Sequence, residues 1–560
     1  MKTRLGAWLL AAAGALLLLH TAWQKSPTWD ETGYFGLGAR LLQTGRWDVP
    51  AACSHPPLAF YLHSLPVFLY PVDWSPWQYR PGLSEDLGFL RAADPRRGNA
   101  LLLDPAYDGQ WLFFLCRATS LVLYGLLAWV LYRWGTQLHG RPGGLLALLL
   151  LAFCPNTLAH ASLINTDFAF AATFALAVYS FQRLLRDPTP RRLAGAALGL
   201  GLALASKLSA LVLLPGLGLG LAWYLALASE EEGQRLAQLQ WWPGRGPWGQ
   251  GVVMYLGVVL GAVLVLWGLY GFQVHPYWLT LRSQMGDLES GHEAYLLGQY
   301  STKGWWYYYP LALLVKTPVP LLVLGVWGLV CALRQRAGWG AMGLVFWPPL
   351  LLLGLFVVGG KDIGLRYLLP VYPFLFLVAG YALPPWQGWA ALKASGMRAW
   401  PAWALGLCCL WHVGGTLRNH PDHLAYFNEL AGGPDQGYRY LVDSNLDWGQ
   451  DLKGLKSYLD ERHLERIKLS YFGTVDPALY GLRYEWLPSF QLPAPPEARA
   501  VLPTGGLIAI SVTNLVGVYM DGYGQGKDLY QWLRAYEPVA RIGHSIWVYD
   551  LPENPAPTSP

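Results

Sequence analysis

Charged residues are scarce in this 560-residue chain. Asp, Glu, Lys and Arg together make up 13% of it, whereas hydrophobic residues make up 54%. An average soluble domain is about 25% charged. The deficit indicates that a lipid bilayer, rather than water, surrounds much of the chain. The net charge of +5 is small for this length and argues against a nucleic-acid-binding protein.

Cysteine is also rare and shows no pattern. Six cysteines occur, none forms a CxxC pair, and five lie in or beside apolar runs. This spacing argues against a disulfide framework and against a zinc site, so the thiols are interpreted as small apolar packing groups. A glycine-rich phosphate loop of the nucleotide-binding type is absent as well, and nothing in the chain predicts a nucleotide sugar as substrate.

Long apolar runs are abundant. A membrane-spanning helix needs about 20 apolar residues. Eleven candidates occur, at 5–23, 111–132, 142–160, 164–182, 192–206, 208–228, 250–273, 309–333, 339–359, 366–384 and 399–417. Residues 192–228 are compatible either with two short helices that meet at Lys207 or with one long tilted span. The sequence predicts an all-α polytopic membrane domain of about eleven helices, and the 29 Trp and 32 Tyr are typical of membrane interfaces.

The orientation follows from the basic residues. The first apolar run comes after Lys2 and Arg4 and lacks a small-x-small cleavage site, so we interpret it as an uncleaved span. Lys and Arg in short loops mark the cytoplasmic side. With eleven spans, the basic loops after spans two, four, six, eight and ten all fall on that side. A ten-span chain would invert the later loops and place the C-terminal tail in the cytoplasm.

The eleven-span arrangement gathers many polar segments on the outer face. They are the first long loop at 24–110, the turns at 161–166 and 360–366, Lys207, the 274–308 loop and the C-terminal tail. Arg117, Asp167 and Lys316 lie at the outer ends of their helices. Charged groups within a span are costly and usually functional, and a transport path would more often hold them near the midplane. The pattern favours a site that opens at the outer interface.

Two parts of the chain are soluble in character. In the first outer loop, 58–70 is apolar but too short to span, so we expect a helix that lies on the bilayer, and 75–110 is expected to be irregular. After about 419 we expect buried strands at 439–442, 466–471, 507–512 and 545–550, with helices at 449–461 and 526–536. The predicted domains are a transmembrane catalytic domain at 1–418 and a C-terminal extracytoplasmic α/β domain at 419–560.

Carboxylates occur where the outer site is predicted. Asp30 and Glu31 directly follow the first span. Transfer of a sugar to a hydroxyl needs a base near the acceptor oxygen, and a carboxylate at the membrane surface supplies one. The alternative is a helix N-terminus, in which Thr28 or Asp30 is the cap and Glu31 favours the dipole. Asp167, which follows Asn165-Thr166, has the same two interpretations.

Cations share this face, namely Arg117, Lys207, Lys316 and Arg366. They either snorkel to the interface or together bind a lipid phosphate, which needs cationic donors there. His55, before Pro56-Pro57, is either structural or a further phosphate contact. In the tail, three acids form either a cluster or a set of turn and cap residues: Asp443, Asp447 and Asp451.

Six motifs, in this order, resemble those of the GT-C glycosyltransferases, in particular the bacterial relatives of protein O-mannosyltransferases and of the lipid A aminoarabinose transferase. They are Asp30-Glu31-Thr32-Gly33-Tyr34, His55-Pro56-Pro57-Leu58, Asn165-Thr166-Asp167, Ala205-Ser206-Lys207, Gly304-Trp305-Trp306-Tyr307-Tyr308-Tyr309-Pro310 with Lys316-Thr317-Pro318, and Arg366-Tyr367-Leu368-Leu369-Pro370. The resemblance covers about residues 5–385. The chain departs from the aminoarabinose transferase at Ser54-His55, where that enzyme has Glu-Lys. This departure argues against a metal site built on that glutamate and against lipid A as acceptor.

The resemblance implies a role for each residue. Asp30 would be the general base of an inverting transfer. Glu31 and Asp167 would support the base, contact the acceptor or, with Asp30, help to hold a divalent metal ion. The donor phosphate would be contacted by His55, Lys207 and Arg366, with Arg117 and Lys316 as further candidates. The donor would be a polyprenyl-phosphate sugar, because no nucleotide sugars are supplied outside the cell.

The sequence therefore predicts a membrane glycosyltransferase that acts on the outer face of a bacterial inner membrane. It would transfer a hexose or pentose to a hydroxyl of a protein, a glycolipid or a cell-surface glycan. One alternative is a transporter or flippase of lipid-linked sugars, which should show related halves and broken midplane helices. Another is a non-catalytic membrane protein that uses its tail for binding.

Overall fold

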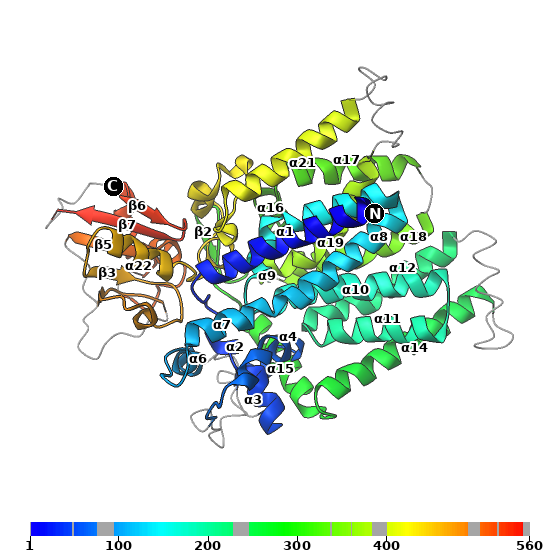
Figure 1. Cartoon of the computed structure of the whole chain (residues 1–560), viewed down its shortest axis with the longest axis horizontal. Coiled ribbons are helices and arrows are strands. Elements are labelled where there is room, and N and C mark those ends of the chain that lie inside the picture. Colours follow the sequence, from blue (N-terminus) through cyan, green and yellow to red (C-terminus); the bar gives the residue numbers. More distant parts are fainter. Residues whose placement is uncertain are drawn as a thin grey trace.

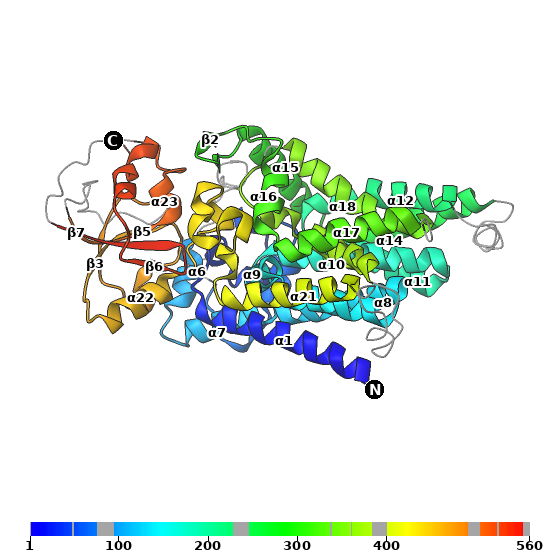
Figure 2. The ribbon, with the colours of Figure 1, turned by 90° about the horizontal axis from the view of Figure 1, so that it is seen from above.

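The computed structural model describes residues 2–47, 50–74, 95–227, 246–335, 339–359, 361–383, 400–490, 505–523 and 526–552. A long helical part is followed by a sheet region that lies at one of its ends (Figure 1). The N-terminus, where α1 (Lys2–Gln24) begins, lies at the end away from the sheet in both views (Figure 2). The first span and the C-terminal region therefore extend toward the same end of the molecule.

All eleven predicted spans are helical. Seven helices are long and apolar enough to cross a membrane, and an eighth span results if α16 (Tyr308–Lys316) and α17 (Val319–Gln335), which are bent by 112°, count as one. The chain is an integral membrane protein. The count by length and composition is three short of eleven. Residues 109–152 count as one apolar helix, α11 (Pro190–Leu204) has only 15 residues, and α21 (Trp400–Arg418) is not among the candidates.

Local breaks explain how these segments are divided. Within α8 (Ser120–Ala152) the backbone leaves the helix at His139 and Gly140, and Gly140 has a φ of 69°, which favours glycine. The predicted junction at Lys207 is a break between two helices, because Lys207 is extended between α11 and η4 (Leu208–Val212). The structure thus confirms the two-helix alternative for 192–228.

Among the spans of the membrane part, α10 (Thr166–Arg186) is one of the most deeply buried, with 83% of its apolar stretch inside the protein. Its many alanine and phenylalanine side chains are buried where α10 packs against α8 and α11, since small and flat side chains let helices approach closely. The other helices here are α7 (Gly109–Ala118), α9 (Pro155–Ala161), α12 (Leu213–Leu227), α14 (Pro247–Leu269), α18 (Trp339–Gly359), η5 (Leu365–Val371), α19 (Tyr372–Ala379), η6 (Gly380–Ala382) and α21 (Trp400–Arg418).

The first long loop is folded into short helices. These are α2 (Glu31–Tyr34), α3 (Leu37–Thr44), η1 (Pro50–Cys53), α4 (Leu58–His63), η2 (Leu65–Leu69) and α6 (Pro95–Leu102). The apolar helix expected at 58–70 is present as α4 and η2. The expectation of an irregular stretch at 75–110 is wrong for 95–102, which is helical because it packs on α2 and α7; residues 75–94 lie outside the described residues.

The C-terminal region holds a five-stranded mixed sheet of order β4-β3-β5-β7-β6. Its strands are β3 (Ile467–Ser470), β4 (Tyr484–Trp486), β5 (Gly506–Ser511), β6 (Ala540–Ile542) and β7 (Ile546–Leu551). β3 is parallel to β4 and β5, whereas β7 is antiparallel to β5 and β6. Three of the four predicted strands and the helix α22 (Leu452–Glu461) are confirmed.

The strand expected at 439–442 is wrong. This stretch follows η10 (Pro434–Arg439) and belongs to a segment that packs on the membrane part instead of joining the sheet. Asn428 donates from Nδ2 to the carbonyl oxygens of Leu314 and Thr317, at 2.6 and 2.7 Å, and Oδ1 of Asn445 accepts from Leu365 N. Residues 424–447 are therefore tied into the helical part, although they follow its last helix.

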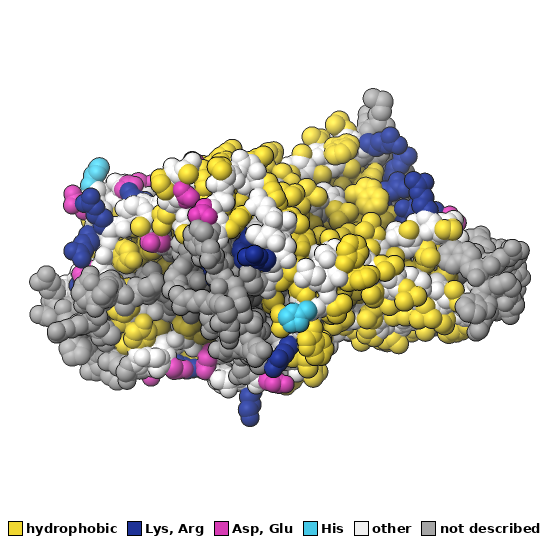
Figure 3. All heavy atoms as spheres, turned by 90° about the horizontal axis from the view of Figure 1, so that it is seen from below, with side chains coloured by type: hydrophobic (Ala, Val, Ile, Leu, Met, Phe, Trp, Pro, Cys, Tyr) yellow, Lys and Arg dark blue, Asp and Glu magenta, His cyan; other side chains and the backbone are white. Residues whose placement is uncertain are grey.

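The 274–308 loop lies over the same end of the molecule. It contains α15 (His275–Ser290), β1 (Ala294–Leu296) and β2 (Gln299–Ser301), and its tip donates from Leu297 N to Tyr440 O at 3.1 Å. On the face shown in Figure 3, hydrophobic side chains cover most of the helical part and charged ones gather toward the two ends. This distribution is typical of a protein that spans a bilayer.

Candidate active site

Four separate stretches of the chain line one cavity between the membrane part and the C-terminal region. Its volume is about 360 Å³. The lining comes from the first outer loop, the 274–308 loop, the turn before η5 and the C-terminal region. Of the predicted site residues, three line it, namely Asp30, His55 and Arg366. The cavity is therefore formed where the motifs of the first loop and of η5 meet.

A series of alternating charges leads from the cavity into the protein. Arg366 donates from Nη1 to Oδ2 of Asp30 at 2.7 Å, and the same nitrogen lies 3.5 Å from Oδ2 of Asp167. Lys207 forms an ion pair with Oδ1 of Asp167. Two carboxylates and two cations thus offset one another, which is required because an unpaired buried charge is very costly. Asp30 and Arg366 keep 14% and 11% of their side chains exposed, so both remain accessible from the cavity.

Neither Asp30 nor Asp167 caps a helix. Asp30 precedes α2 but its side chain makes no capping hydrogen bond. At the start of α10, the side chain of Asn165 accepts from Asp167 N at 3.1 Å and from Phe168 N at 3.2 Å. Because Asn165 satisfies these amides, the carboxylate of Asp167 is left for the two cations.

Aromatic rings enclose the cations. The guanidinium of Arg366 lies 4.3 Å from the centre of the Trp448 ring, and Nζ of Lys207 lies 4.2 Å from the centre of the Tyr367 ring. Such contacts favour a cation that has lost water. They also hold the guanidinium in place between its two carboxylates.

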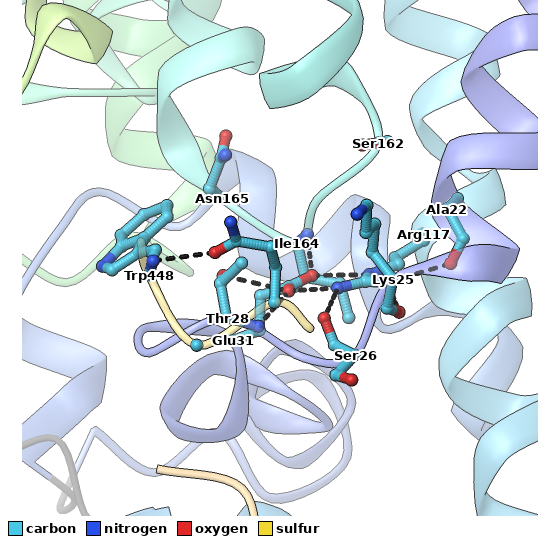
Figure 4. A network of polar contacts seen from close by, with 12 residues as sticks. Ala22, Lys25, Ser26, Thr28, Glu31, Arg117, Ser162, Ile164, Asn165 and Trp448 are labelled. Carbon is cyan, nitrogen blue, oxygen red and sulfur yellow. Dashed lines mark hydrogen bonds and ion pairs between the residues drawn. The ribbon is translucent and has the colours of Figure 1, made fainter. Parts of the chain in front are cut away.

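Glu31, unlike its neighbour Asp30, does not line the cavity. Figure 4 shows the polar groups that surround Glu31. Its carboxylate accepts from Thr28 N at 2.7 Å, from Ile164 N at 2.6 Å and from Nε of Arg117 at 2.9 Å. Glu31 and Arg117 are both fully buried. This carboxylate is occupied by the protein itself and does not line the cavity.

Arg117 is equally occupied. Besides Glu31, it donates to three carbonyl oxygens at the end of the first span, those of Ala22, Lys25 and Ser26, at 2.7–2.9 Å. All five N–H groups of a guanidinium are thereby used. The pair fastens the exit of α1 to α7 and so sets the position of the turn that carries Asp30.

Lys316, like Arg117 and Lys207, is a predicted phosphate contact that does not line the cavity. Its Nζ donates to the carbonyl oxygens of Leu424 and Asn445 and lies 4.5 Å from the centre of the Phe427 ring. Only 3% of the residue is exposed. Lys316 therefore attaches the segment 424–447 to α16.

His55 lines the cavity as a neutral ring. Burial lowers the pKa of His55 to about 3, an effect to which the nearby charges of Lys207 and Lys361 add. Its Nδ1 is buried without a hydrogen-bond partner in the structure. Near neutral pH this side chain can offer one N–H to a ligand oxygen but no positive charge.

The three predicted carboxylates do not form a set of metal ligands in this arrangement. Asp30 and Asp167 share Arg366, and Glu31 is saturated by Arg117 and backbone amides. Within the ranges that the structure describes, no group of three or more His, Cys, Asp or Glu side chains is placed to hold a metal ion. We therefore derive no step through a metal.

Sequence reasoning missed several residues of the cavity. Lys361 lines it from the turn before η5, and Asp443 lines it from the C-terminal region. The signal for Lys361 was its place five residues before Arg366, in a turn predicted to be external. Asp443 was weighed only as part of an acidic cluster, which the structure disperses: Asp447 accepts from Thr513 N at 2.9 Å and Asp451 pairs with Lys25.

The structure combines a helical membrane part with a C-terminal α/β region, as the sequence predicts. Residues 110–267 match the model of the dolichyl-phosphate-mannose-protein mannosyltransferase family. This match confirms the resemblance to GT-C glycosyltransferases that the motifs predict. It covers the segment that carries Arg117, Asp167 and Lys207.

Solved structures show a similar chain course at low identity. The crystal structure of ArnT from Cupriavidus metallidurans bound to undecaprenyl phosphate is 14% identical and covers 96% of this chain and 97% of its own, with a TM-score of 0.46. The oligosaccharyltransferase of Archaeoglobus fulgidus in complex with Zn and sulfate is 13% identical and covers 72% of this chain and 53% of its own, with a TM-score of 0.40. Among curated proteins, no sequence matches the chain.

Proposed function

We propose that this protein transfers a sugar from a polyprenyl-phosphate donor to a hydroxyl acceptor at the outer face of the membrane. The observation that carries the proposal is the pair of Asp30 and Arg366 at the cavity wall, joined at 2.7 Å. It places a carboxylate that can accept a proton beside a cation that can meet a phosphate. The family matched by residues 110–267, which uses a lipid-phosphate mannose, supports the donor class.

In the proposed step, the acceptor oxygen attacks the anomeric carbon from the side opposite the phosphate. The bond between this carbon and the phosphate oxygen breaks, and its electron pair stays with the phosphate. The acceptor proton passes to Asp30. The products are a glycosylated acceptor with an inverted anomeric centre and polyprenyl phosphate, so atoms and charges balance.

The cations act on the leaving group in this proposal. Negative charge grows on the phosphate as the bond breaks, and positive groups already in place there stabilise the transition state more than the ground state. Arg366 and Lys361, which both line the cavity, are assigned to this phosphate. Lys207 acts through Asp167, whose carboxylate holds Arg366. His55 adds one neutral N–H donor.

The proposal includes the side of the membrane on which the cavity lies. The C-terminal region lines part of the cavity. This region lies at one end of the helical part, away from the N-terminus (Figures 1 and 2). With the basic N-terminus in the cytoplasm of a bacterium, this end lies outside the inner membrane. We propose domains at 1–418 and 419–560, with the first 30 or so residues of the second bound to the first.

The test is turnover by the purified protein in nanodiscs. A panel of polyprenyl-phosphate sugars is supplied with an acceptor-containing membrane extract, and release of polyprenyl phosphate is measured by mass spectrometry. We expect release that depends on both the donor and the extract. If no donor of the panel is turned over while the protein remains folded, the proposed function is overturned.

A further inference from the structure

The C-terminal region contributes an aromatic wall to the cavity, formed by Trp448, Phe472, Phe490 and Tyr519. Three of its rings are stacked on one another, with centroids 4.7–5.9 Å apart and planes within 6–23° of parallel: Phe472, Phe490 and Tyr519. Phe490 and Tyr519 are only half-buried. Trp448 and Phe472 are each only 2% exposed, so Phe490 and Tyr519 are the rings of the wall that a ligand in the cavity can reach.

The aromatic wall is attached directly to the motif that carries Asp30. Trp29 donates from its backbone N to Trp448 O at 2.9 Å, and its carbonyl oxygen accepts from Oγ1 of Thr474 at 2.7 Å. Thr474 lies two residues after Phe472. These bonds hold the wall against the turn of the proposed base, so a group that rests on the wall lies next to Asp30.

The direction of the reaction assigns this wall to the acceptor. The isoprenoid chain of the donor reaches the cavity from the bilayer, and the cations proposed for its phosphate, Lys361 and Arg366, belong to the membrane part. An inverting attack comes from the side of the donor sugar that faces away from the phosphate. The attacking oxygen must therefore lie beside the base Asp30, and the aromatic wall is attached to the preceding residue, Trp29.

The chemistry of the wall indicates what the acceptor is. The negative face of an aromatic ring attracts polarised C–H groups, which a sugar ring presents on its flat sides. Beside the rings stands the carboxylate of Asp443, held by Ser444 N and by the hydroxyl of Tyr519. A carboxylate accepts only, which suits a ligand rich in hydroxyl donors. Rings that stack and a carboxylate that accepts together fit a saccharide.

A peptide acceptor predicts a different kind of cavity lining. Extended peptides are commonly bound by pairing with a free strand edge. None of the described residues that line the cavity lies in a strand. We infer that the aromatic wall is the acceptor subsite and that it takes a sugar ring of a glycan or glycolipid. This inference rests on the proposed glycosyltransferase function.

The acceptor class is tested with a radiolabelled polyprenyl-phosphate sugar, the purified protein and membranes of the native host. The labelled product is digested with protease and fractionated. The expected result is label in a protease-resistant glycan or glycolipid fraction. Label in peptides, from which alkaline β-elimination frees it, would overturn the inference and leave the proposed function standing. If nothing is labelled, the proposed function fails and the inference fails with it.

The subsite itself is tested with Phe490→Leu, which removes a half-buried ring and keeps an apolar side chain. With the labelled fraction as acceptor, its KM for the acceptor should rise about five- to tenfold, the value of one aromatic contact, while the KM for the donor stays within twofold. Phe490→Tyr keeps the ring and should recover most of this loss. Trp532→Leu, an aromatic of the same region outside the cavity, is the matched control. An unchanged acceptor KM in Phe490→Leu, or an equal rise in Trp532→Leu, would overturn the assignment.

Discussion

Arg366 and Asp30, 336 positions apart in the chain, are joined by a hydrogen bond of 2.7 Å between Nη1 and Oδ2. The contact brings the motif after the first span to the motif before the last predicted pair of spans. The same guanidinium also lies 3.5 Å from Asp167, so one side chain connects three of the six motifs that carry the resemblance. It fixes the distance between the proposed base and the proposed phosphate site.

Replacing Arg366 should affect the donor first. Arg366→Lys keeps the charge but loses the planar fork, so the KM for the polyprenyl-phosphate donor should rise about tenfold, and Arg366→Met should raise it further. Equilibrium binding of polyprenyl phosphate to the protein in detergent measures the effect without turnover. Unchanged binding in both variants would show that Arg366 does not contact the phosphate.

The pair of Glu31 and Arg117 should govern stability rather than chemistry. Glu31→Gln leaves a fully buried guanidinium without its counter-ion, so the free energy of unfolding should fall by about 3–5 kcal/mol. Thermal unfolding in detergent is the measurement. The double variant Glu31→Gln with Arg117→Met also removes the unpaired positive charge. Its free energy of unfolding should therefore fall less than that of Glu31→Gln alone. A stable Glu31→Gln protein that has lost turnover would instead assign Glu31 to the reaction.

Asp362, in the turn before η5, should make stability depend on pH. Its Oδ1 is buried without a partner, and burial raises the pKa of this carboxyl to about 6. An unfolded Asp has a pKa near 3.9, so between these values only the folded chain holds the proton. The free energy of unfolding should therefore fall as the pH rises from about 4 to about 6, by up to about 3 kcal/mol, and then level off.

Asp362→Asn removes this titration. We expect the variant to unfold at a temperature that changes less than that of the wild type between pH 4 and 6. The exposed Asp460→Asn serves as the control and should behave as the wild type does. A wild-type profile that rises across this interval would contradict the assigned pKa shift.

The topology is checked by labelling single cysteines in a cysteine-free background. Glu461→Cys lies on α22 of the C-terminal region, and Arg186→Cys lies at the end of α10 that points away from it. In intact cells, an impermeant thiol reagent should label the first position and should reach the second only after lysis. The reverse pattern would place the cavity in the cytoplasm.

The sequence predicted the membrane part and the face that holds the site because both rest on local signals. Apolar length marks the spans, and charges within them are rare enough to point to function. Asp30 and Arg366 stand beside predicted spans, whereas His55 is predicted from the motif His55-Pro56-Pro57-Leu58 that resembles the family. The gap between the spans predicted at 111–132 and 142–160 coincides with the break of the helix at His139 and Gly140.

The sequence did not predict which of two adjacent acids faces the cavity. Asp30 and Glu31 have the same chemistry, and α2 is only four residues long, so the direction of each side chain is set by partners far along the chain: Arg366 for Asp30 and Arg117 for Glu31. Asp443 was likewise hidden, because its place in the cavity depends on how 424–447 packs on the helices. No local periodicity carries such information.

The central claim is tested most directly by Asp30→Asn in the donor-turnover assay, with Asp460→Asn as the matched surface control. Asparagine keeps the size and one acceptor oxygen but takes up no proton at neutral pH. Turnover of the polyprenyl-phosphate sugar should fall about 10²- to 10⁴-fold, as for the loss of a general base, while donor binding and thermal unfolding stay close to those of the control. Full turnover in a folded Asp30→Asn protein would contradict Asp30 as the base and the mechanism built on it.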